Sequence, residues 1–181
     1  MIVEFEPGKP RVDDHDLALK LYREKSKLYN ITYKYGTNRG IALLDGEGKS
    51  STVSQMPGFY IIYGPKILGE MKIDLSESVP YYVGYAGLNN TMHVRIGRCI
   101  AGIMEKSYDS EPHAGADKIR HLLGPKVANL LSVCMMPYDI RDWEEATDAV
   151  QSRMGWEKKY WERVETALVR FINPAFNTKR V

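Results

Sequence analysis

The chain of 181 residues has little cysteine, no long apolar run and a small net charge. Its two cysteines, Cys99 and Cys134, have no nearby third cysteine, which fits a reducing compartment and argues against a structural zinc site. No apolar stretch approaches the roughly 20 residues that a membrane-spanning helix needs. The first residues also lack the basic and apolar pattern of a secretory signal. These absences predict an intracellular, cytoplasmic location and no membrane partner.

The charge balance neither requires nor excludes nucleic acid. A net charge of +2 permits nucleic-acid binding, so the distribution of charge is more informative than its sum. A hydrophobic fraction of 44% and a charged fraction of 27% are ordinary for a globular protein. Basic residues gather in four places, most of which we expect to be solvated faces: Lys20 to Lys27, Arg95 and Arg98, Lys118 and Arg120, and Lys179 and Arg180.

The beginning of the chain predicts a helix followed by a hairpin or loop. Leu17, Leu21 and Leu28 recur on one side of a helix with charged residues between them, which predicts a helix over residues 13–30. Residues 36–55 are rich in Gly, Ser, Asn and Thr around a short apolar run, which indicates a hairpin or a mobile loop.

Three apolar segments predict the strands of a small sheet. Residues 59–63 and 81–86 are short aromatic and apolar runs bounded by Gly or Pro, which is typical of strands. Between them, residues 64–80 form a longer polar connection than a tight hairpin needs, so we expect it to project from the sheet. Residues 127–136 are apolar enough for a buried central strand.

Helical periodicity completes the element order. It predicts helices over residues 92–106, about 114–123, 141–153 and 156–172. The order predicts an α+β fold with a small, mostly antiparallel, three-stranded sheet flanked by helices. We divide the chain into an N-terminal extension, residues 1–55, and a core, residues 56–181.

Glu165 is a charged residue on an apolar helix face. It lies four residues after Trp161 and three before Leu168, where an unpaired charge would cost several kcal/mol. A salt bridge would explain it, and so would a metal, because Mg²⁺ needs only one or two carboxylates beside water and phosphate oxygens. The same phase predicts an inward stripe of Trp161, Val164, Leu168, Phe171 and Ile172, with Glu162, Arg163, Thr166 and Arg170 on the other side.

Two arginines on the helix near residue 92 differ in their position. Arg95 borders the buried stripe that contains Ile96 and Cys99, whereas Arg98 points away from it. A guanidinium is always charged and can bind two oxygens, which suits a phosphoryl group. Arg95 is therefore the better candidate for a phosphate contact, with Arg98 as the alternative, and a surface role for Arg95 stays open.

Two tyrosines lie on the predicted strands. Alternation places Tyr82 on one face with Gly84 and Ala86, whose small size leaves room for a ligand. Tyr60 shares its face with Ile62. A phenol with a pKa near 10 is a poor base unless positive charge lies beside it. Packing is the alternative role for each tyrosine, since the chain has twelve.

The ordered set of these segments resembles the GIY-YIG nuclease family. Gly58-Phe59-Tyr60 stands in place of the first motif and Tyr82-Val83-Gly84 in place of the second. The other matching segments are Arg95-Ile96-Gly97-Arg98-Cys99, His113 ahead of a helix, Glu165 within Glu165-Thr166-Ala167-Leu168-Val169, and Pro174-Ala175-Phe176-Asn177. The resemblance covers the chain from about residue 57 onward and implies a three-stranded sheet with flanking helices.

The resemblance also implies roles for the site residues. Tyr60 and Tyr82 would orient or activate the attacking water, and Arg95 would steady the phosphate. Glu165 would bind the metal, which is Mg²⁺ with Mn²⁺ as a substitute, and Asn177 would support the site.

Two further positions concern proton transfer. By resemblance, His113 would contact phosphate or aid proton transfer. Many family members carry histidine one helical turn after the arginine, where this chain has Cys99. That departure puts a proton-shuttling role at this position in doubt.

The resemblance implies a divalent-metal-dependent endonuclease that hydrolyses phosphodiester bonds in double-stranded DNA, as a type II restriction enzyme does. Residues 1–55 could then read DNA, and cleavage of both strands at a symmetric site would favour a homodimer. Two alternatives stay open. One is a non-catalytic nucleic-acid-binding protein on the same scaffold, and the other is a structure-specific repair or recombination nuclease.

Overall fold

The computed structural model describes residues 12–34, 40–69, 72–87, 90–104, 113–137 and 153–177. The strands are β1 (Lys27–Lys34), β2 (Gly40–Leu44), β3 (Gly58–Leu68), β4 (Lys72–Ala86) and β5 (Ser132–Pro137). The α-helices are α1 (Val12–Lys25), α2 (Met92–Met104), α3 (Ala114–Leu123) and α5 (Arg153–Ile172), and two 3₁₀ helices are Val53–Gln55 and Pro125–Leu130. The predicted helix over residues 141–153 lies outside the described residues except for its last residue.

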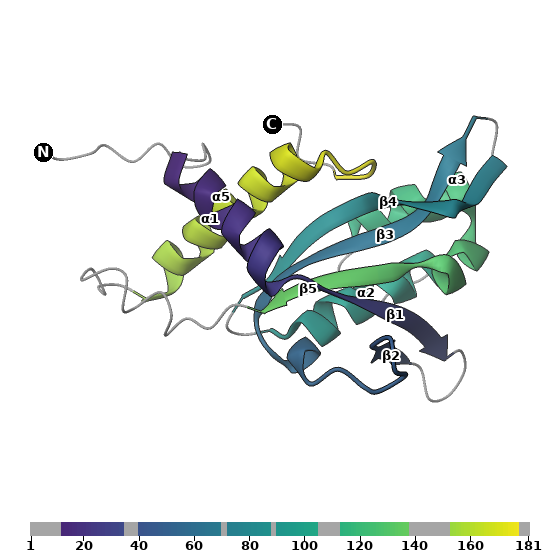
Figure 1. Ribbon diagram of the computed structural model, residues 1–181, viewed down its shortest axis with the longest axis horizontal. Coiled ribbons are helices and arrows are strands. Elements are labelled where there is room, and N and C mark those ends of the chain that lie inside the picture. The colour runs from purple at the N-terminus through teal and green to yellow at the C-terminus, as the bar shows by residue number, and fades with distance from the viewer. Residues whose placement is uncertain are drawn as a thin grey trace, which may run out of the picture.

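The five strands of the described residues form one antiparallel sheet in the order β2-β1-β5-β3-β4 (Figure 1). The predicted α+β class is confirmed, and the three predicted strands are neighbours as β5, β3 and β4. The predicted number of strands is wrong, because β1 and β2 extend the same sheet to five.

The two additional strands come from a segment whose first part was predicted to be helical. α1 ends at Lys25, and Leu28, predicted on the helical stripe, lies in β1 and is 61% exposed. From Tyr29 the chain alternates, with Tyr29 and Ile31 buried. Aromatic and β-branched residues favour a strand that can pack one face against a core. The sheet therefore crosses the predicted boundary at residue 56, while a DNA-reading role for the extension stays a prediction.

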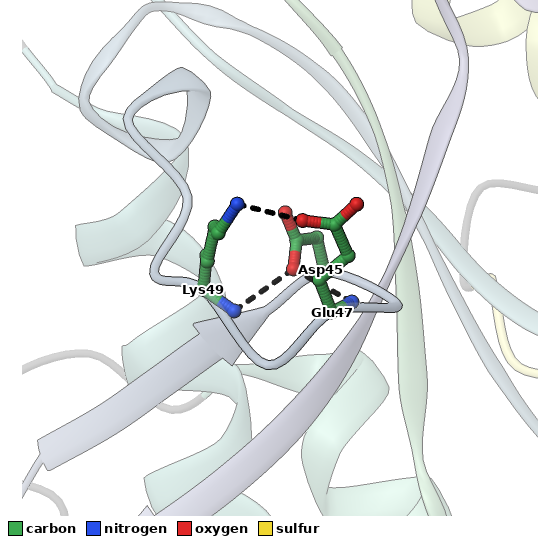
Figure 2. Close-up of polar contacts among 3 residues, drawn as sticks. All are labelled: Asp45, Glu47 and Lys49. Carbon is green, nitrogen blue, oxygen red and sulfur yellow. Dashed lines mark hydrogen bonds and ion pairs between the residues drawn. The ribbon is translucent and has the colours of Figure 1, made fainter.

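A compact turn follows β2, within the segment that was predicted to be a hairpin or a mobile loop. The Asp45 carboxylate accepts hydrogen bonds from the backbone N–H groups of Glu47 and Lys49, at 3.0 and 2.8 Å (Figure 2). The Lys49 ammonium lies 2.7 Å from the Glu47 carboxylate on the exposed side of the turn (Figure 2). Gly48 adopts φ = 77°, which glycine tolerates without strain.

The β3–β4 hairpin is longer than predicted. Both predicted strands, residues 59–63 and 81–86, are confirmed, but most of the connection between them is also strand. β3 pairs with β5 only through Tyr63, so the rest of the hairpin extends beyond the neighbouring strand (Figure 1). Register shifts at Ile62/Tyr63 and at Pro65/Lys66 interrupt the regular pairing, as bulges do where a strand bends.

β5 occupies the central position that its apolar sequence predicted. The predicted strand over residues 127–136 is only partly correct, because Pro125–Leu130 forms a 3₁₀ helix and the strand starts at Ser132. Gly124 begins that turn with φ = 74° and Pro125 follows it, a sequence that favours a turn over a strand.

Each face of the sheet has its own core. On one face, Tyr60 and Ile62 of β3 pack with α2 and α3. On the other face, Phe59 and Ile61 of β3 pack with α1 and α5, which cross each other over the sheet (Figure 1). Trp161 of α5 lies 4.8 Å from the Phe59 ring. β3 is buried on both faces, which explains its continuous apolar sequence.

Among the described residues, no helix combines the length and the apolarity that crossing a membrane requires.

Gly58, the first residue of β3, should tolerate no side chain. A Cβ there would collide with the Met136 carbonyl oxygen and would lie 3.0 Å from Met92 Sδ. We expect Gly58→Ala to lower the free energy of unfolding by about 1–3 kcal/mol. Thermal unfolding would measure this as a fall of about 2–4 °C in Tm per kcal/mol. The matched control is Gly40→Ala at the start of β2, where a Cβ meets nothing within 4 Å. Equal Tm values for the two variants would contradict this packing.

Candidate functional site

Two neighbouring strands place a pair of tyrosines on the sheet face that α2 and α3 cover. Tyr60 of β3 lies opposite Gly84 of β4, and Tyr82 lies two residues before Gly84. The two rings are 6.3 Å apart. A Cβ at Gly84 would lie 2.6 Å from the Tyr60 hydroxyl oxygen and 2.8 Å from the Tyr82 ring. Gly84 was expected to leave room for a ligand beside Tyr82, but the Tyr60 ring fills that space.

The Tyr60 hydroxyl is a buried polar atom with no hydrogen-bond partner among the described residues. Burial raises the pKa of Tyr60 well above its usual value, and Tyr82 and Cys99 raise it further while Arg95 opposes them. Tyr60 is therefore protonated at neutral pH and has an O–H group available as a donor. A buried hydroxyl without a partner costs about 1–3 kcal/mol, so its presence indicates a place where a polar ligand would be stabilised.

Tyr82 is protonated for the same reason. Burial raises its pKa most, and the Glu165 carboxylate adds to the effect, whereas Arg95 lowers the pKa. A tyrosine that accepts a proton from water needs a lowered pKa. The described residues do not provide it, so the acceptor role stays a prediction that requires additional positive charge beside the phenol.

α2 directs Arg95 toward these tyrosines, as its helical phase predicted. Burial alone would lower the pKa of Arg95, but the phenols and the Glu165 carboxylate outweigh it and raise the pKa. Arg95 is thus fully charged and in electrostatic contact with both tyrosines. Arg98, three residues later on the helix, is exposed. This difference supports Arg95 over Arg98 as the site arginine.

α5 brings Glu165 to the same place. Glu165 is 6% exposed, which confirms its predicted position on the inward face. Its charge affects the pKa values of Tyr60, Tyr82 and Arg95, so it lies at their cluster although α5 packs mainly on the opposite face of the sheet.

The predicted inward stripe of α5 is wrong at two other positions. Arg163, predicted to face outward, is 4% exposed, and Phe171, predicted to face inward, is 50% exposed. Phe171 instead meets the Tyr22 ring of α1 at 5.8 Å. α5 packs on both the sheet and α1, so more than one of its sides is buried near Arg163. A periodicity analysis that assumes one buried side does not predict this.

His113 joins the cluster as the residue that caps α3. Its Nδ1 accepts a hydrogen bond from the Ala116 N–H at 3.3 Å, and its ring meets the Tyr82 ring edge-on at 4.9 Å. Burial, and after it the charge of Arg95, lowers the pKa of His113 to about 4. His113 is therefore neutral at physiological pH, with its proton on Nε2. That nitrogen is buried and has no hydrogen-bond partner among the described residues.

Asn177 contacts the backbone of β4. Its amide oxygen accepts from the Val83 N–H at 2.8 Å, and its amide nitrogen donates to the Val83 carbonyl at 2.9 Å. The chain reaches β4 because Asn173 ends α5 with φ = 51° and Pro174 follows. Asn177 thus pairs with the edge strand next to Tyr82. This geometry fits the predicted supporting role and joins the end of α5 to β4.

Cys99 lies beside Tyr60 and is completely buried. Burial raises the pKa of its thiol to about 12. The thiol therefore keeps its proton at neutral pH, so proton shuttling at this position has no support in the geometry.

The structure brings five of the six predicted site residues into one cluster: Tyr60, Tyr82, Arg95, His113 and Glu165. The sixth, Asn177, is hydrogen-bonded to the backbone of Val83, the residue that follows Tyr82 in β4. Sequence reasoning missed Gly115, whose missing side chain admits the Tyr82 ring, and Tyr85, which is among the groups that raise the pKa of Arg95. No sequence signal marks either residue, because both act through packing across different elements.

The donor set of the cluster fits Mg²⁺ held mainly by water and substrate. In the described part of the chain, no three His, Cys, Asp or Glu side chains gather as a metal cage. Glu165 supplies one hard carboxylate oxygen donor at the cluster. Mg²⁺ commonly uses one or two carboxylates with phosphate oxygens and water, so Glu165 is the residue that would hold it.

His113 should remain neutral through the physiological range. Its pKa falls from 6.5 in the unfolded chain to about 4 in the fold. The unfolded chain then binds more protons between these values, so the stability that His113 contributes is lost as the pH falls from about 6.5 toward 4. The ring signal of His113 in an NMR titration, assigned by its loss in His113→Asn, should not move between about pH 8 and pH 5. A signal that titrates near 6.5 would contradict this environment.

Comparisons of the chain with protein-family models, with curated proteins and with solved structures yield no match.

Proposed function

We propose that this chain is a divalent-metal-dependent endonuclease that hydrolyses phosphodiester bonds in double-stranded DNA, of the type II restriction kind. The observation that supports the proposal is the convergence of Tyr60, Tyr82, Arg95 and Glu165 from four separate elements on one cluster. A permanent cation can stabilise the phosphate charge, two phenols can donate hydrogen bonds and one carboxylate can hold a metal, which are three of the functions that phosphodiester hydrolysis uses.

Arg95 binds the scissile phosphate in this proposal. Its guanidinium is charged at physiological pH, and the Glu165 carboxylate is among the groups that raise its pKa. It can donate two parallel hydrogen bonds to phosphate oxygens, and its charge offsets the negative charge that develops in the transition state. Because the cluster is largely buried, these interactions are stronger than they would be in water.

The tyrosines orient the attacking water. The Tyr60 O–H is completely buried and has no partner among the described residues, so it would donate to a water or phosphate oxygen that enters the cluster. One tyrosine would accept the proton of the attacking water as its phenolate, so its own proton must first leave to solvent. That loss requires positive charge beyond that of Arg95, since burial holds the pKa of both phenols high.

Glu165 holds Mg²⁺, with Mn²⁺ as a substitute, in this proposal. Bound there, the ion would polarise the phosphate and lower the pKa of nearby groups. The burial of Glu165 and its coupling to Tyr82 support this assignment, because they keep the carboxylate at the tyrosine cluster.

The remaining parts of the proposal concern the setting of the site. We place the enzyme in the cytoplasm and assign DNA reading to residues 1–55. Cleavage of two strands at a symmetric site would call for a homodimer. A structure-specific repair or recombination nuclease is separated from this proposal by comparing the cleavage of linear and branched duplexes.

One observation favours a second candidate, a nucleic-acid-binding protein without catalysis. Cys99 keeps its proton, because burial raises the pKa of its thiol to about 12. Neutral His113 has a pKa near 4 and also exchanges no proton at neutral pH. DNA binding in a mobility-shift assay, with no cleavage product under Mg²⁺ or Mn²⁺, would favour this candidate.

Glu165→Gln should abolish most cleavage of plasmid DNA in Mg²⁺. The substitution removes the charge and keeps the shape, so we expect a loss in rate of about 100-fold or more with the fold retained. The rate is measured with purified protein and the fold by thermal unfolding. Glu162→Gln, less than one turn earlier on the same helix and less buried, is the matched control. A Glu165→Gln rate close to that of the unchanged chain would refute the assigned role.

Arg95→Lys should lower the cleavage rate while preserving the charge. Lysine cannot form the two parallel hydrogen bonds that a guanidinium makes, so we expect a fall in kcat of about 10-fold to 100-fold. Arg98→Lys on the exposed side of α2 should change kcat little. Reversal of the two effects would make Arg98 the phosphate contact.

A further inference from the structure

The first turn of α3 forms a wall against the ring of Tyr82. A Cβ at Gly115 would lie 2.6 Å from Tyr82 Cδ2 and 2.8 Å from Cε2, so the helix backbone approaches the ring as closely as glycine allows. On the same turn, the His113 ring meets Tyr82 edge-on, with centroids 4.9 Å apart and an interplanar angle of 67°. β4 therefore supplies the phenol, and α3 limits where its ring can lie.

The helix cap fixes the orientation of the imidazole. Because His113 Nδ1 accepts the Ala116 N–H, the proton of the neutral ring is on Nε2. Two charged groups bear on its pKa, namely Arg95 from α2, which lowers it, and Asp117 from α3, which raises it, while Tyr82 from β4 contacts the ring. The cap also leaves Nε2–H as a buried donor without a partner among the described residues.

We propose that the first turn of α3 is the positioning element of the Tyr82 phenol, with Gly115 admitting the ring and His113 packing edge-on against it. The proposal rests on the endonuclease function proposed above and gives His113 a role separate from the two that the resemblance implied. His113 and Gly115 act through Tyr82, so they are positioning residues.

The orientation of Tyr82 matters because its hydroxyl is one of the groups proposed to orient the attacking water. Gly84 of β4 also admits the Tyr82 ring, since a Cβ there would lie 2.8 Å from it, and the Tyr60 ring lies 6.3 Å away. A reacting group that moves by about 1 Å can lose about 100-fold in rate. A small displacement of the α3 turn should therefore reduce kcat more than it reduces substrate binding.

Four variants separate positioning from capping. Gly115→Ala places a methyl group where the Tyr82 ring lies. His113→Asn removes the imidazole but keeps a good capping side chain, and His113→Ala removes both. Gly97→Ala is the control on α2, because a Cβ at Gly97 meets only Ile41 at 3.8 Å.

Two measurements are made on each variant. The first is the NMR signal of the Tyr82 ring in protein labelled at tyrosine, assigned by its loss in Tyr82→Phe. The second is kcat and KM for DNA cleavage in Mg²⁺, with thermal unfolding as the measure of folding. The ring signal needs no activity, so it tests the positioning role even if the proposed nuclease function fails.

We expect Gly115→Ala and His113→Asn to shift the Tyr82 signal and to lower kcat by about 10-fold or more with little change in KM. Gly97→Ala should leave both unchanged. His113→Ala should add a loss of stability that His113→Asn does not show. An unchanged Tyr82 signal in folded Gly115→Ala and His113→Asn would overturn the proposal, and so would activity in His113→Asn equal to that of the unchanged chain.

Discussion

The antiparallel register between β3 and β4 is the constraint on which the candidate site depends. It sets Tyr60 opposite Gly84 and puts Tyr82 on the same face. The absence of a side chain at Gly84 lets both rings share that face. A shift of one residue would turn every side chain of one strand to the other face, because side chains alternate along a strand. The remaining groups of the cluster are then brought to this pair by the helices that cover the sheet.

Burial decides what the cluster can do chemically. It raises the pKa of both phenols and of Cys99, and it lowers that of His113. Each of these groups is therefore in its uncharged form at neutral pH. Among the predicted site residues whose charge states the structure defines, Arg95 keeps a charge. The protein itself therefore supplies hydrogen-bond donors and a fixed positive charge. Proton acceptance depends on charge added by a bound ion or substrate.

The segment that follows α5 links the two faces of the sheet. α5 packs with α1 over one face, whereas the tyrosines lie on the other. After Asn173 and Pro174, Phe176 and Asn177 pair with the edge of β4. The edge strand is covered there by its own chain, which protects backbone groups that would otherwise be open to pairing. The same pairing joins the element that carries Glu165 to the strand that carries Tyr82.

The sequence was most informative where one element alone decides the result. Helical phase predicted that Glu165 is buried and that Arg95 and Arg98 face different ways, and strand alternation predicted that Tyr82 and Gly84 share a face. The sequence was less informative where pairing with another strand overrides the local spacing of apolar residues. Residues 27–34 form a strand because β5 and β2 pair with them, although Leu28 continues a helical spacing.

The sequence by itself determined the α+β class, the three strands nearest the tyrosines and the inward position of Glu165, because apolar periodicity reports which side of an element is buried. Tertiary structure alone decided that the sheet has five strands and that the Tyr60 ring fills the space over Gly84. It also decided that His113 and Gly115 pack against the Tyr82 ring. These features arise from contacts between segments far apart in the chain, and local spacing carries no information about such distances. The charge states depend on the same contacts, because desolvation is set by everything that surrounds a group.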